Sequence, residues 1–243
     1  MNQTDDVVVV TGAARGIGLE IAREARQRGL RVALLDVDAA GLRAARGALG
    51  EEGCLEVITD VASAASVAAA VQRVEAELGP VTVWINNAGL ARHHWIPDYT
   101  EAEIDLMLAV NLKGTILGSQ AALRVMIPRR RGHIVNIIST ASLRGIPSET
   151  VYCAAKWGVR GFTQGLAEEA AAHRVRVTAV LPGGVDTEFW TDAARGDAPR
   201  GLFLKPAQVA EAVLACLEMS EGCVPRELVV RSLDDSDFSV KPA

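Results

Sequence analysis

A tyrosine and a lysine lie four residues apart in the segment Tyr152-Cys153-Ala154-Ala155-Lys156. In a helix this spacing places both side chains on one face. Free tyrosine has a pKa of about 10, which is too high for a general acid–base catalyst at neutral pH. A neighbouring ammonium group stabilises the phenolate and lowers that pKa. The pair therefore predicts that Tyr152 transfers protons with the help of Lys156.

A serine follows a mostly apolar run upstream of this pair. Ser139 comes directly after residues 134–138, a run typical of a buried strand. In open α/β sheets, ligands bind beyond the carboxyl ends of the strands. A hydroxyl at that edge can orient the oxygen of a carbonyl or an alcohol, so Ser139 is a candidate substrate-orienting residue.

A glycine-rich turn, Thr11-Gly12-Ala13-Ala14-Arg15-Gly16-Ile17-Gly18, follows the first apolar strand and opens an amphipathic helix. Glycines allow a tight turn and let the backbone approach a diphosphate. The helix N-terminus offers free N–H groups and the positive end of its dipole. This context predicts dinucleotide binding rather than a purely structural turn. The residues expected against the cofactor are Gly12, Arg15, Gly16, Ile17 and Gly18.

The second expected strand ends in an acid, Asp36. A carboxylate at this position can accept hydrogen bonds from the adenosine ribose and would repel a 2′-phosphate, which favours NAD over NADP. Arg15 argues the other way, because a guanidinium in the glycine turn could bind a 2′-phosphate. The residue after Asp36 is Val37 rather than a basic residue, so we expect NAD, with NADP as the alternative.

The elements that position these candidate residues are indicated by the sequence pattern. Short β-branched runs alternate with longer alanine-rich segments of helical period. The alternation is typical of βαβ units. It predicts an α/β, single-domain doubly wound Rossmann fold with a seven-stranded parallel sheet over residues 1–233, followed by a polar C-terminal tail over 234–243. The irregular stretch 183–205 is expected to be a lid or a binding loop. The expected strands are 7–10, 32–35, 55–59, 81–85, 134–138, 175–181 and 228–230, and the expected helices are 17–28, 39–49, 64–78, 101–127, 151–172 and 206–219.

Composition argues against several classes of protein. The chain has 243 residues, 49% of them hydrophobic but only 4% aromatic, so one aliphatic core is expected. A formal net charge of −5 argues against a nucleic-acid partner. No apolar segment is expected to reach the roughly 18 residues of a membrane span. The polar start is unlike a secretory signal, and the four cysteines lack metal-ligand spacing, which together favour reduced thiols in the cytoplasm.

Together these motifs resemble the short-chain dehydrogenase/reductase family, from about Val7 to Val230. The segments that match the family's order and spacing are the glycine motif at 11–18, Asn86-Asn87-Ala88-Gly89 after the fourth strand, Ser139, the Tyr152–Lys156 pair, and Pro182-Gly183 after the sixth strand. The activity that the resemblance implies is hydride transfer between NAD(H) and a secondary alcohol or ketone.

The resemblance also implies roles for individual residues. Tyr152 would be the proton donor and acceptor, Lys156 would lower its pKa and hold the nicotinamide ribose, and Ser139 would position the substrate oxygen. Asn111, in a long helix, matches the family's fourth catalytic residue, which holds a water in a proton relay. The further cofactor contacts implied are Asp60 and Val61 at the adenine, Asn87, Ala88 and Gly89 along the cofactor, and Pro182, Gly183, Val185 and Thr187 near the nicotinamide.

The end of the chain departs from the family pattern. Many members end in a Val-Asp-Gly-Gly stretch that packs in a tetramer interface, whereas this chain has residues 228–233 and an acidic tail instead. We expect a homo-oligomer, with a dimer and a tetramer both open. The helices 101–127 and 151–172 are the expected subunit faces.

Substrate identity depends on loops that carry no motif. Aromatic and apolar residues in these loops predict a pocket for an apolar or aromatic secondary alcohol or ketone. The expected pocket residues are His94, Trp95, Leu143, Phe189 and Trp190, with Arg144, Ile146 and Phe203 nearby in the same loops. His93 and His94 have no third ligand nearby in sequence, so no metal site is expected.

Two other functions fit the same scaffold. A catalytically silent dinucleotide sensor could bind partners according to redox state, but such a protein would tolerate loss of the Tyr152–Lys156 pair. An epimerase or dehydratase generally needs a larger C-terminal substrate domain than this chain has room for.

Overall fold

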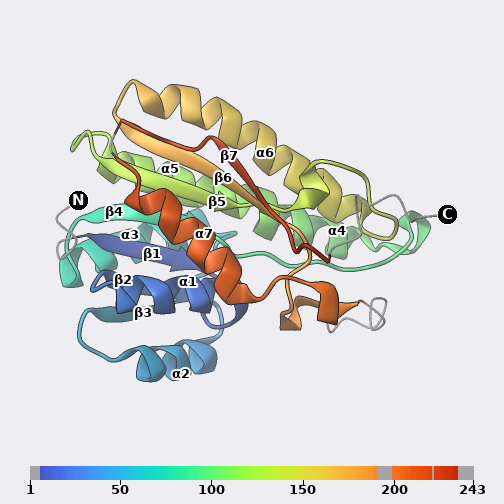
Figure 1. Cartoon of the computed structure of the whole chain (residues 1–243), viewed down its shortest axis with the longest axis horizontal. Coiled ribbons are helices and arrows are strands. Elements are labelled where there is room, and N and C mark those ends of the chain that lie inside the picture. The colour runs from blue at the N-terminus through green and yellow to red at the C-terminus, as the bar shows by residue number, and fades with distance from the viewer. Residues whose placement is uncertain (1–5, 191–198, 221, 235–243) are drawn as a thin grey trace.

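All seven strands lie in one parallel sheet of order β3-β2-β1-β4-β5-β6-β7. The structure, a computed structural model, describes residues 6–190, 199–220 and 222–234. Within those ranges the predicted seven-stranded, doubly wound fold is confirmed (Figure 1). Residues 235–243 of the predicted tail and 191–198 of the predicted lid lie outside the described residues.

The strands and helices follow the predicted alternation closely. The strands are β1 Val7–Thr11, β2 Arg31–Asp36, β3 Cys54–Ile58, β4 Val81–Asn86, β5 Gly132–Ile137, β6 Val175–Pro182 and β7 Glu227–Val230. The helices are α1 Gly16–Gln27, α2 Ala39–Leu49, α3 Ala64–Glu77, α4 Glu101–Met107, α5 Gly114–Met126, α6 Thr150–Ala171 and α7 Pro206–Glu218. Each parallel crossover needs a covering helix, which explains why apolar strands and amphipathic helices alternate along the chain.

Helices cover both faces of the sheet. One face packs against α1, α2 and α7, through buried residues that include Ile21, Leu42 and Leu214. The other face packs against α3, α5 and α6, and α1 and α7 lie side by side (Figure 1). Because both faces of the sheet are covered, β1 is buried along its whole length.

The predicted helix 101–127 is interrupted, which corrects the expectation of one regular helix. A π-helix, Leu108–Lys113, separates α4 from α5. Within it the side-chain amide of Asn111 donates to the carbonyl of Met107 at 2.9 Å, and the hydroxyl of Thr115 donates to the carbonyl of Asn111 at 2.9 Å. These side-chain bonds supply partners where the regular helical ladder is broken, and π-bulges of this kind are frequent at functional sites.

The segment Glu101–Met126 is more apolar than the sequence analysis expected. By length and composition it could cross a membrane, since an 18-residue stretch of it has a mean hydropathy of 1.2. In the fold its α5 part packs on β4 and its π-helix packs on α6. Core helices pass the same test of length and composition, so one such helix is weak evidence of a span.

A polar network in the core corrects the expectation of an entirely aliphatic interior. Trp84 is fully buried, and its indole N–H donates to Asn86 Oδ1 at 2.8 Å. The amide of Asn86 donates to Ser119 at 3.0 Å and to Asn136 at 2.8 Å. Buried polar groups are tolerable only when paired in this way. Gly118 of α5 leaves the space that the network occupies.

We predict that Gly118→Ala destabilises the fold by about 1–3 kcal/mol, as overpacking generally does. A Cβ at this position would lie 2.3 Å from Asn86 Oδ1 and 2.8 Å from Trp84 Nε1. Gly47→Ala, at an exposed helical glycine with no atom within 4 Å of the new Cβ, should instead stabilise by about 0.5–1 kcal/mol. Urea unfolding measures the unfolding free energy of both variants. Changes of the same sign in the two variants would contradict the packing argument.

Candidate active site

One cavity of about 860 Å³ lies along the carboxyl edge of the sheet. Its walls come from the connections that follow β1 to β6, which are distant from one another in sequence. In a doubly wound sheet this edge is where crossovers diverge and leave a crevice. The cavity therefore brings together most of the residues that the sequence singled out.

The turns that follow β1 and β4 are joined by a compact set of hydrogen bonds. The hydroxyl of Thr11 accepts from the backbone N–H groups of Asn87 at 2.9 Å and Ala88 at 3.0 Å. The side-chain amide of Asn87 donates back to the carbonyls of Thr11 at 2.9 Å and Gly12 at 3.1 Å. These bonds tie the glycine turn to the Asn-Ala-Gly turn, so both present backbone to the same cavity.

The glycine turn has the form expected of a diphosphate cradle. Gly12 and Gly16 have positive φ values of 65° and 59°, and both line the cavity together with Arg15 and Ile17. Arg15, the N-cap of α1, makes no side-chain cap, so no side chain at that position covers the first N–H groups of the helix. Uncapped N–H groups and the helix dipole suit an anion.

Gly18 lies behind the cavity wall. It is buried and is not among the described residues that line the cavity. A Cβ at Gly18 would lie 2.2 Å from the carbonyl oxygen of Gly12. Gly18 therefore permits the close packing of α1 under the turn.

Acidic groups line the end of the cavity near β2 and β3. Asp36, Asp60 and Val61 all lie in the wall, and Asp38 joins them. The carboxylate of Asp36 accepts from the backbone N–H of Ala14 at 3.1 Å and of Asp38 at 3.1 Å. These bonds hold Asp36 beside the glycine turn, where the sequence analysis expected the adenosine ribose.

Ser139, Tyr152 and Lys156 meet at the other end of the cavity. Ser139 follows β5 and begins the short 3₁₀ helix Thr140–Ser142, while Tyr152 and Lys156 lie in the first turns of α6. The ammonium of Lys156 lies 5.5 Å from the centre of the Tyr152 ring and donates to the carbonyl of Ile137 at 3.2 Å. The side chain of Ser139 lies close enough to Tyr152 to lower the pKa of the phenol.

Burial dominates the proton affinities of this pair. Loss of solvent raises the pKa of Tyr152 above its ordinary value, nearby Glu149 raises it further, and the side chain of Ser139 acts in the opposite direction. Burial lowers the pKa of Lys156 to about 8. The sequence analysis expected the lysine to lower the tyrosine pKa, whereas in this form of the protein desolvation outweighs any such effect.

Asn111 lies behind the cavity wall rather than in it. Its Oδ1 accepts from the N–H of Leu90 at 3.2 Å, and its amide donates to the carbonyl of Leu90 at 2.8 Å. Gly89 leaves room between Asn111 and Lys156, since a Cβ there would lie 2.8 Å from Asn111 Oδ1 and 3.7 Å from Lys156 Nζ. Asn111 is therefore close to Lys156, with its side chain fully buried.

The segment after β6 forms the remaining wall. Pro182, Gly183, Val185 and Thr187 line the cavity, as do Phe189 and Trp190 of the following short helix. The ring of Phe189 lies 5.6 Å from that of Tyr152. The carboxylate of Asp186 binds both Arg200 at 2.7 Å and Lys205 at 2.8 Å, which ties the two described parts of the predicted lid together.

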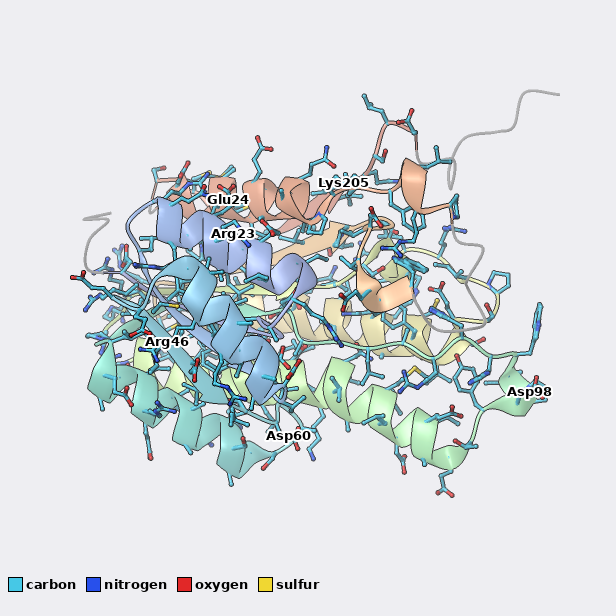
Figure 2. All side chains as sticks on the ribbon, turned by 90° about the horizontal axis from the view of Figure 1, so that it is seen from below. Arg23, Glu24, Arg46, Asp60, Asp98 and Lys205 are labelled. Carbon is cyan, nitrogen blue, oxygen red and sulfur yellow. The ribbon has the colours of Figure 1, made fainter. Side chains whose placement is uncertain are left out.

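Three predicted pocket residues lie elsewhere. His94 binds Glu103 at 3.2 Å, and Trp95 is 67% exposed on a loop whose Asp98 lies at the outer edge of the molecule (Figure 2). Leu143 packs into an apolar cluster with Ile138 and Val159. The loop after the Asn-Ala-Gly turn leaves the cavity beyond Arg92, which the sequence pattern did not indicate.

Arg92 and Glu149 are among the cavity residues that the sequence analysis did not name. Arg92 lies in the wall two residues before the predicted His94, and Glu149 lies in the wall three residues before Tyr152, on the same helix face. The helical spacing to Tyr152 is the signal that could have revealed Glu149. Arg144, Ile146 and Phe203, expected only as neighbours of the pocket, line it directly. Among the described residues, no group of three His, Cys, Asp or Glu side chains could hold a metal ion.

Comparison of the chain with known proteins identifies its family. A family model described as short chain dehydrogenase matches residues 6–198. The chain belongs to the short-chain dehydrogenase/reductase family. Family membership makes it an oxidoreductase of the class that acts on alcohols and ketones.

Relatives and solved structures of this family match nearly the whole chain. A 2-(S)-hydroxypropyl-CoM dehydrogenase of Xanthobacter autotrophicus is 37% identical over 88% of this chain and 89% of its own. A bovine 3-oxoacyl-[acyl-carrier-protein] reductase is 36% identical over 88% and 92%. The alcohol dehydrogenase of Thermococcus sibiricus, complexed with 5-hydroxy-NADP, superposes with a TM-score of 0.86 at 30% identity, covering 95% of this chain and 97% of that one. A metagenomic short-chain oxidoreductase in complex with NADP gives 0.83 at 32% identity, over 96% and 99%.

The depressed pKa of Lys156 predicts a stability effect with a definite sign. The unfolded chain holds the lysine proton up to about pH 10.5, whereas the folded protein releases it near pH 8. Lys156 should therefore make the unfolding free energy rise by about 2 kcal/mol between pH 7 and pH 9.5. Comparison of wild type with Lys156→Met by urea unfolding at both pH values isolates this contribution. If the unfolding free energy changes equally with pH in both proteins, Lys156 does not make this contribution.

Proposed function

We propose that this protein transfers a hydride between NAD(H) and a secondary alcohol or ketone, with Tyr152 as the general acid–base. The observation that carries the proposal is the meeting of Ser139, Tyr152 and Lys156 in the wall of the cavity that the glycine turn also lines. A nucleotide cradle and a proton-transfer group in one enclosed space suit dehydrogenation, because hydride and proton must leave the same carbinol.

Each residue of the site has a distinct part in the proposed reaction. Ser139 orients the substrate oxygen, and Tyr152 donates a proton to it in reduction or accepts one in oxidation. Lys156, buried beside both Tyr152 and Gly89, supplies positive charge for the phenolate form and a donor for the cofactor ribose. Asn111 lies close enough to Lys156 to extend a proton path through a water, as its match to the family pattern implies.

The cradle and the acidic end suit a dinucleotide. Gly12, Gly16 and the uncapped start of α1 would hold the diphosphate, and Asp36 the adenosine ribose. Asp60 and Val61 would bind the adenine. The turn Asn87–Gly89 and the segment from Pro182 to Thr187 would enclose the nicotinamide half. When bound, the cofactor supplies or accepts the hydride.

The charge around Asp36 supports NAD as the cofactor. Asp36, Asp38 and Asp60 all line the adenosine end, so a 2′-phosphate there would meet three carboxylates. Arg15, the one cation of the glycine turn, lies 3.4 Å from Glu188 across the cavity. That ion pair directs the guanidinium toward the lid segment rather than toward Asp36.

NADP is the second candidate cofactor, because the two superposed structures carry NADP or a derivative of it. Arg15 and Glu188 are 72% and 68% exposed, and exposed ion pairs are weak. Release of Arg15 from Glu188 would let the guanidinium turn toward a 2′-phosphate.

The substrate, the assembly and the location complete the proposal. Phe189, Trp190 and Phe203 favour a small apolar or aromatic substrate.

Leu106 of α4 and Trp157 of α6 are 41% and 49% exposed, which supports a homo-oligomer that buries them. Cys54, Cys153 and Cys216 are buried free thiols, in keeping with a cytoplasmic location.

Removal of the tyrosine hydroxyl tests the catalytic assignment. Tyr152→Phe should lower kcat by at least about a hundredfold, the usual contribution of general acid–base catalysis, because no proton can then reach the substrate oxygen. NADH affinity, followed by fluorescence, should change little, since the ring remains in place. Near-normal turnover by Tyr152→Phe would remove Tyr152 from the mechanism. A wild type that binds NADH but turns over no alcohol or ketone of a broad panel would favour the silent sensor instead.

Removal of the ribose-binding acid tests the cofactor preference. Asp36→Ala should lower kcat/KM for NAD and raise it for NADP, so that the NAD/NADP ratio falls by about tenfold or more. Steady-state kinetics with each cofactor and one substrate measures the ratio. Glu188→Gln is the matched comparison, because it frees Arg15 without touching the acidic end. An Asp36→Ala ratio equal to that of wild type would refute the role of Asp36.

A further inference from the structure

Two loops that are distant in sequence line the cavity beside Tyr152. Residues 90–92 follow the Asn-Ala-Gly turn, whereas Ile146 and Glu149 come from the segment that leads into α6. The loops meet at one apolar cluster, in which Ala91 packs with Tyr152 and against which Ile146 packs. The surroundings of Tyr152 therefore depend on how these two loops are held together.

The hydroxyl of Tyr99 joins the two loops. It donates to the carbonyl of Arg92 at 2.5 Å and to that of Ser148 at 3.1 Å, so the two carbonyls share its single proton. It also accepts from the backbone N–H of His94 at 3.5 Å. Tyr99 is half-buried and is not among the described residues that line the cavity. Its hydroxyl therefore acts on the loops rather than on a ligand.

The turn at Ser148 is one that needs such support. Ser148 has a φ of 62°, in the left-handed region that residues with a Cβ rarely adopt. A conformation of this kind persists when the surrounding structure holds it in place. The bond from Tyr99 reaches the carbonyl of Ser148 from 49 positions away in the chain, so it stabilises the turn from outside.

Ser148 leads directly into the helix that carries Tyr152. The next residue, Glu149, is the N-cap of α6, and its carbonyl accepts from the N–H of Cys153 at 2.7 Å. The course of the chain at Ser148 therefore sets the start of the first helical turn, in which Tyr152 lies. A reacting group displaced by about 1 Å can lose on the order of a hundredfold in rate.

The surroundings of Tyr99 keep its hydroxyl protonated. Burial raises the pKa of Tyr99, the hydrogen bond with His94 acts in the opposite direction, and nearby Glu149 raises it further. The phenol therefore remains a hydrogen-bond donor at neutral pH.

We propose that Tyr99 is a positioning residue, whose hydroxyl ties the loop at Arg92 to the turn at Ser148 and so aligns Tyr152 with the substrate oxygen. We call the two bonds from Tyr99 to Arg92 and Ser148 the Tyr99 tether. This inference rests on the proposed dehydrogenase function and adds to it a residue that touches neither substrate nor cofactor.

Tyr99→Phe tests the tether in the full-length protein, with NADH and either acetophenone or butan-2-one. The ring, which lies 5.3 Å from that of His94, is kept, and the hydroxyl is removed. We expect kcat to fall by about tenfold while KM changes by less than about twofold, because the substrate still binds but is less well aligned. NADH affinity, followed by fluorescence, should be unchanged, since the glycine turn is not altered.

Thr82→Val is the matched control for the loss of a hydroxyl. The hydroxyl of Thr82 likewise binds backbone, accepting from the N–H of Val7 at 3.0 Å and donating to its carbonyl at 3.3 Å. Thr82 lies near the start of β4, at the end of the strand away from the cavity. Thr82→Val should lower the unfolding free energy but leave kcat and KM unchanged. Equal losses of kcat in Thr82→Val and Tyr99→Phe would overturn the proposal.

Substitutions at Ser148 test the same tether from its other side. In the Tyr99→Phe background, Ser148→Gly should recover about threefold or more of the lost kcat, because glycine adopts the left-handed conformation without strain. Ser148→Ala removes the same hydroxyl but keeps the Cβ, and should recover none. Ser148→Val, made with Tyr99 intact, should reproduce the loss of kcat, since a β-branched residue strongly disfavours this turn. Equal recovery by Ser148→Ala and Ser148→Gly would overturn the proposal.

Hydrogen exchange gives a readout that does not depend on turnover. In the NADH complex of Tyr99→Phe, exchange should become faster in residues 90–99 and in residues 148–153 together, and stay unchanged in the glycine turn at 11–18. Faster exchange in residues 90–99 alone would show that the tether does not hold the start of α6, and the proposal would fail.

The outcomes separate this inference from the proposed function. If the wild type reduces ketones and Tyr152→Phe does not, a Tyr99→Phe variant with the kcat of wild type would overturn the role of Tyr99 and leave the dehydrogenase function standing. Absence of turnover of both probes and of every other alcohol and ketone by the wild type would overturn both.

Discussion

The hydrogen bonds between Thr11 and the Asn87–Gly89 turn are the constraint on which the site depends. Successive crossovers run outward from β1 in one direction and from β4 in the other, so the connections diverge and leave a crevice beyond the carboxyl ends of these two paired strands. The hydroxyl of Thr11 and the amide of Asn87 close that crevice at its base. Gly12 and Gly18 let the backbones meet, since a Cβ at either would collide with neighbouring backbone. The cavity lies in this crevice, with Asp36 at one end and Tyr152 at the other.

The catalytic end illustrates a conflict between enclosure and ionisation. Burial excludes water from Tyr152 and Lys156, but it also favours the neutral form of each, as the directions of both pKa shifts show. The acid Glu149 reinforces the effect on the tyrosine. A charged ligand at this end would shift the pKa values of Tyr152 and Lys156, because electrostatic interactions are stronger in a low-dielectric cavity. The proton affinities of Tyr152 and Lys156 therefore depend on the same electrostatic environment.

Sequence reasoning succeeded where a local pattern has a local cause. The alternation of apolar strands and amphipathic helices predicted the sheet, and the spacing of Tyr152 and Lys156 predicted their common helix face. It failed where a residue's position depends on the course of a loop. Trp95 and Leu143 were expected in the pocket, yet Trp95 is exposed and Leu143 packs in an apolar cluster with Ile138 and Val159. Arg92 belongs to no motif, so only the fold places it in the cavity, whereas the one sequence signal for Glu149 is its helical spacing to Tyr152.

The sequence by itself determined the family, the order of elements and the residues of the glycine turn and the Ser139–Tyr152–Lys156 group. Each of these is specified by residue types at short, fixed spacings, which local geometry converts directly into structure. Only the tertiary structure decided which charges share the cavity, that Gly18 serves packing, and that a π-helix interrupts the helix holding Asn111. These outcomes arise from contacts between segments far apart in the chain, and the packing that selects them leaves no periodic trace in the sequence.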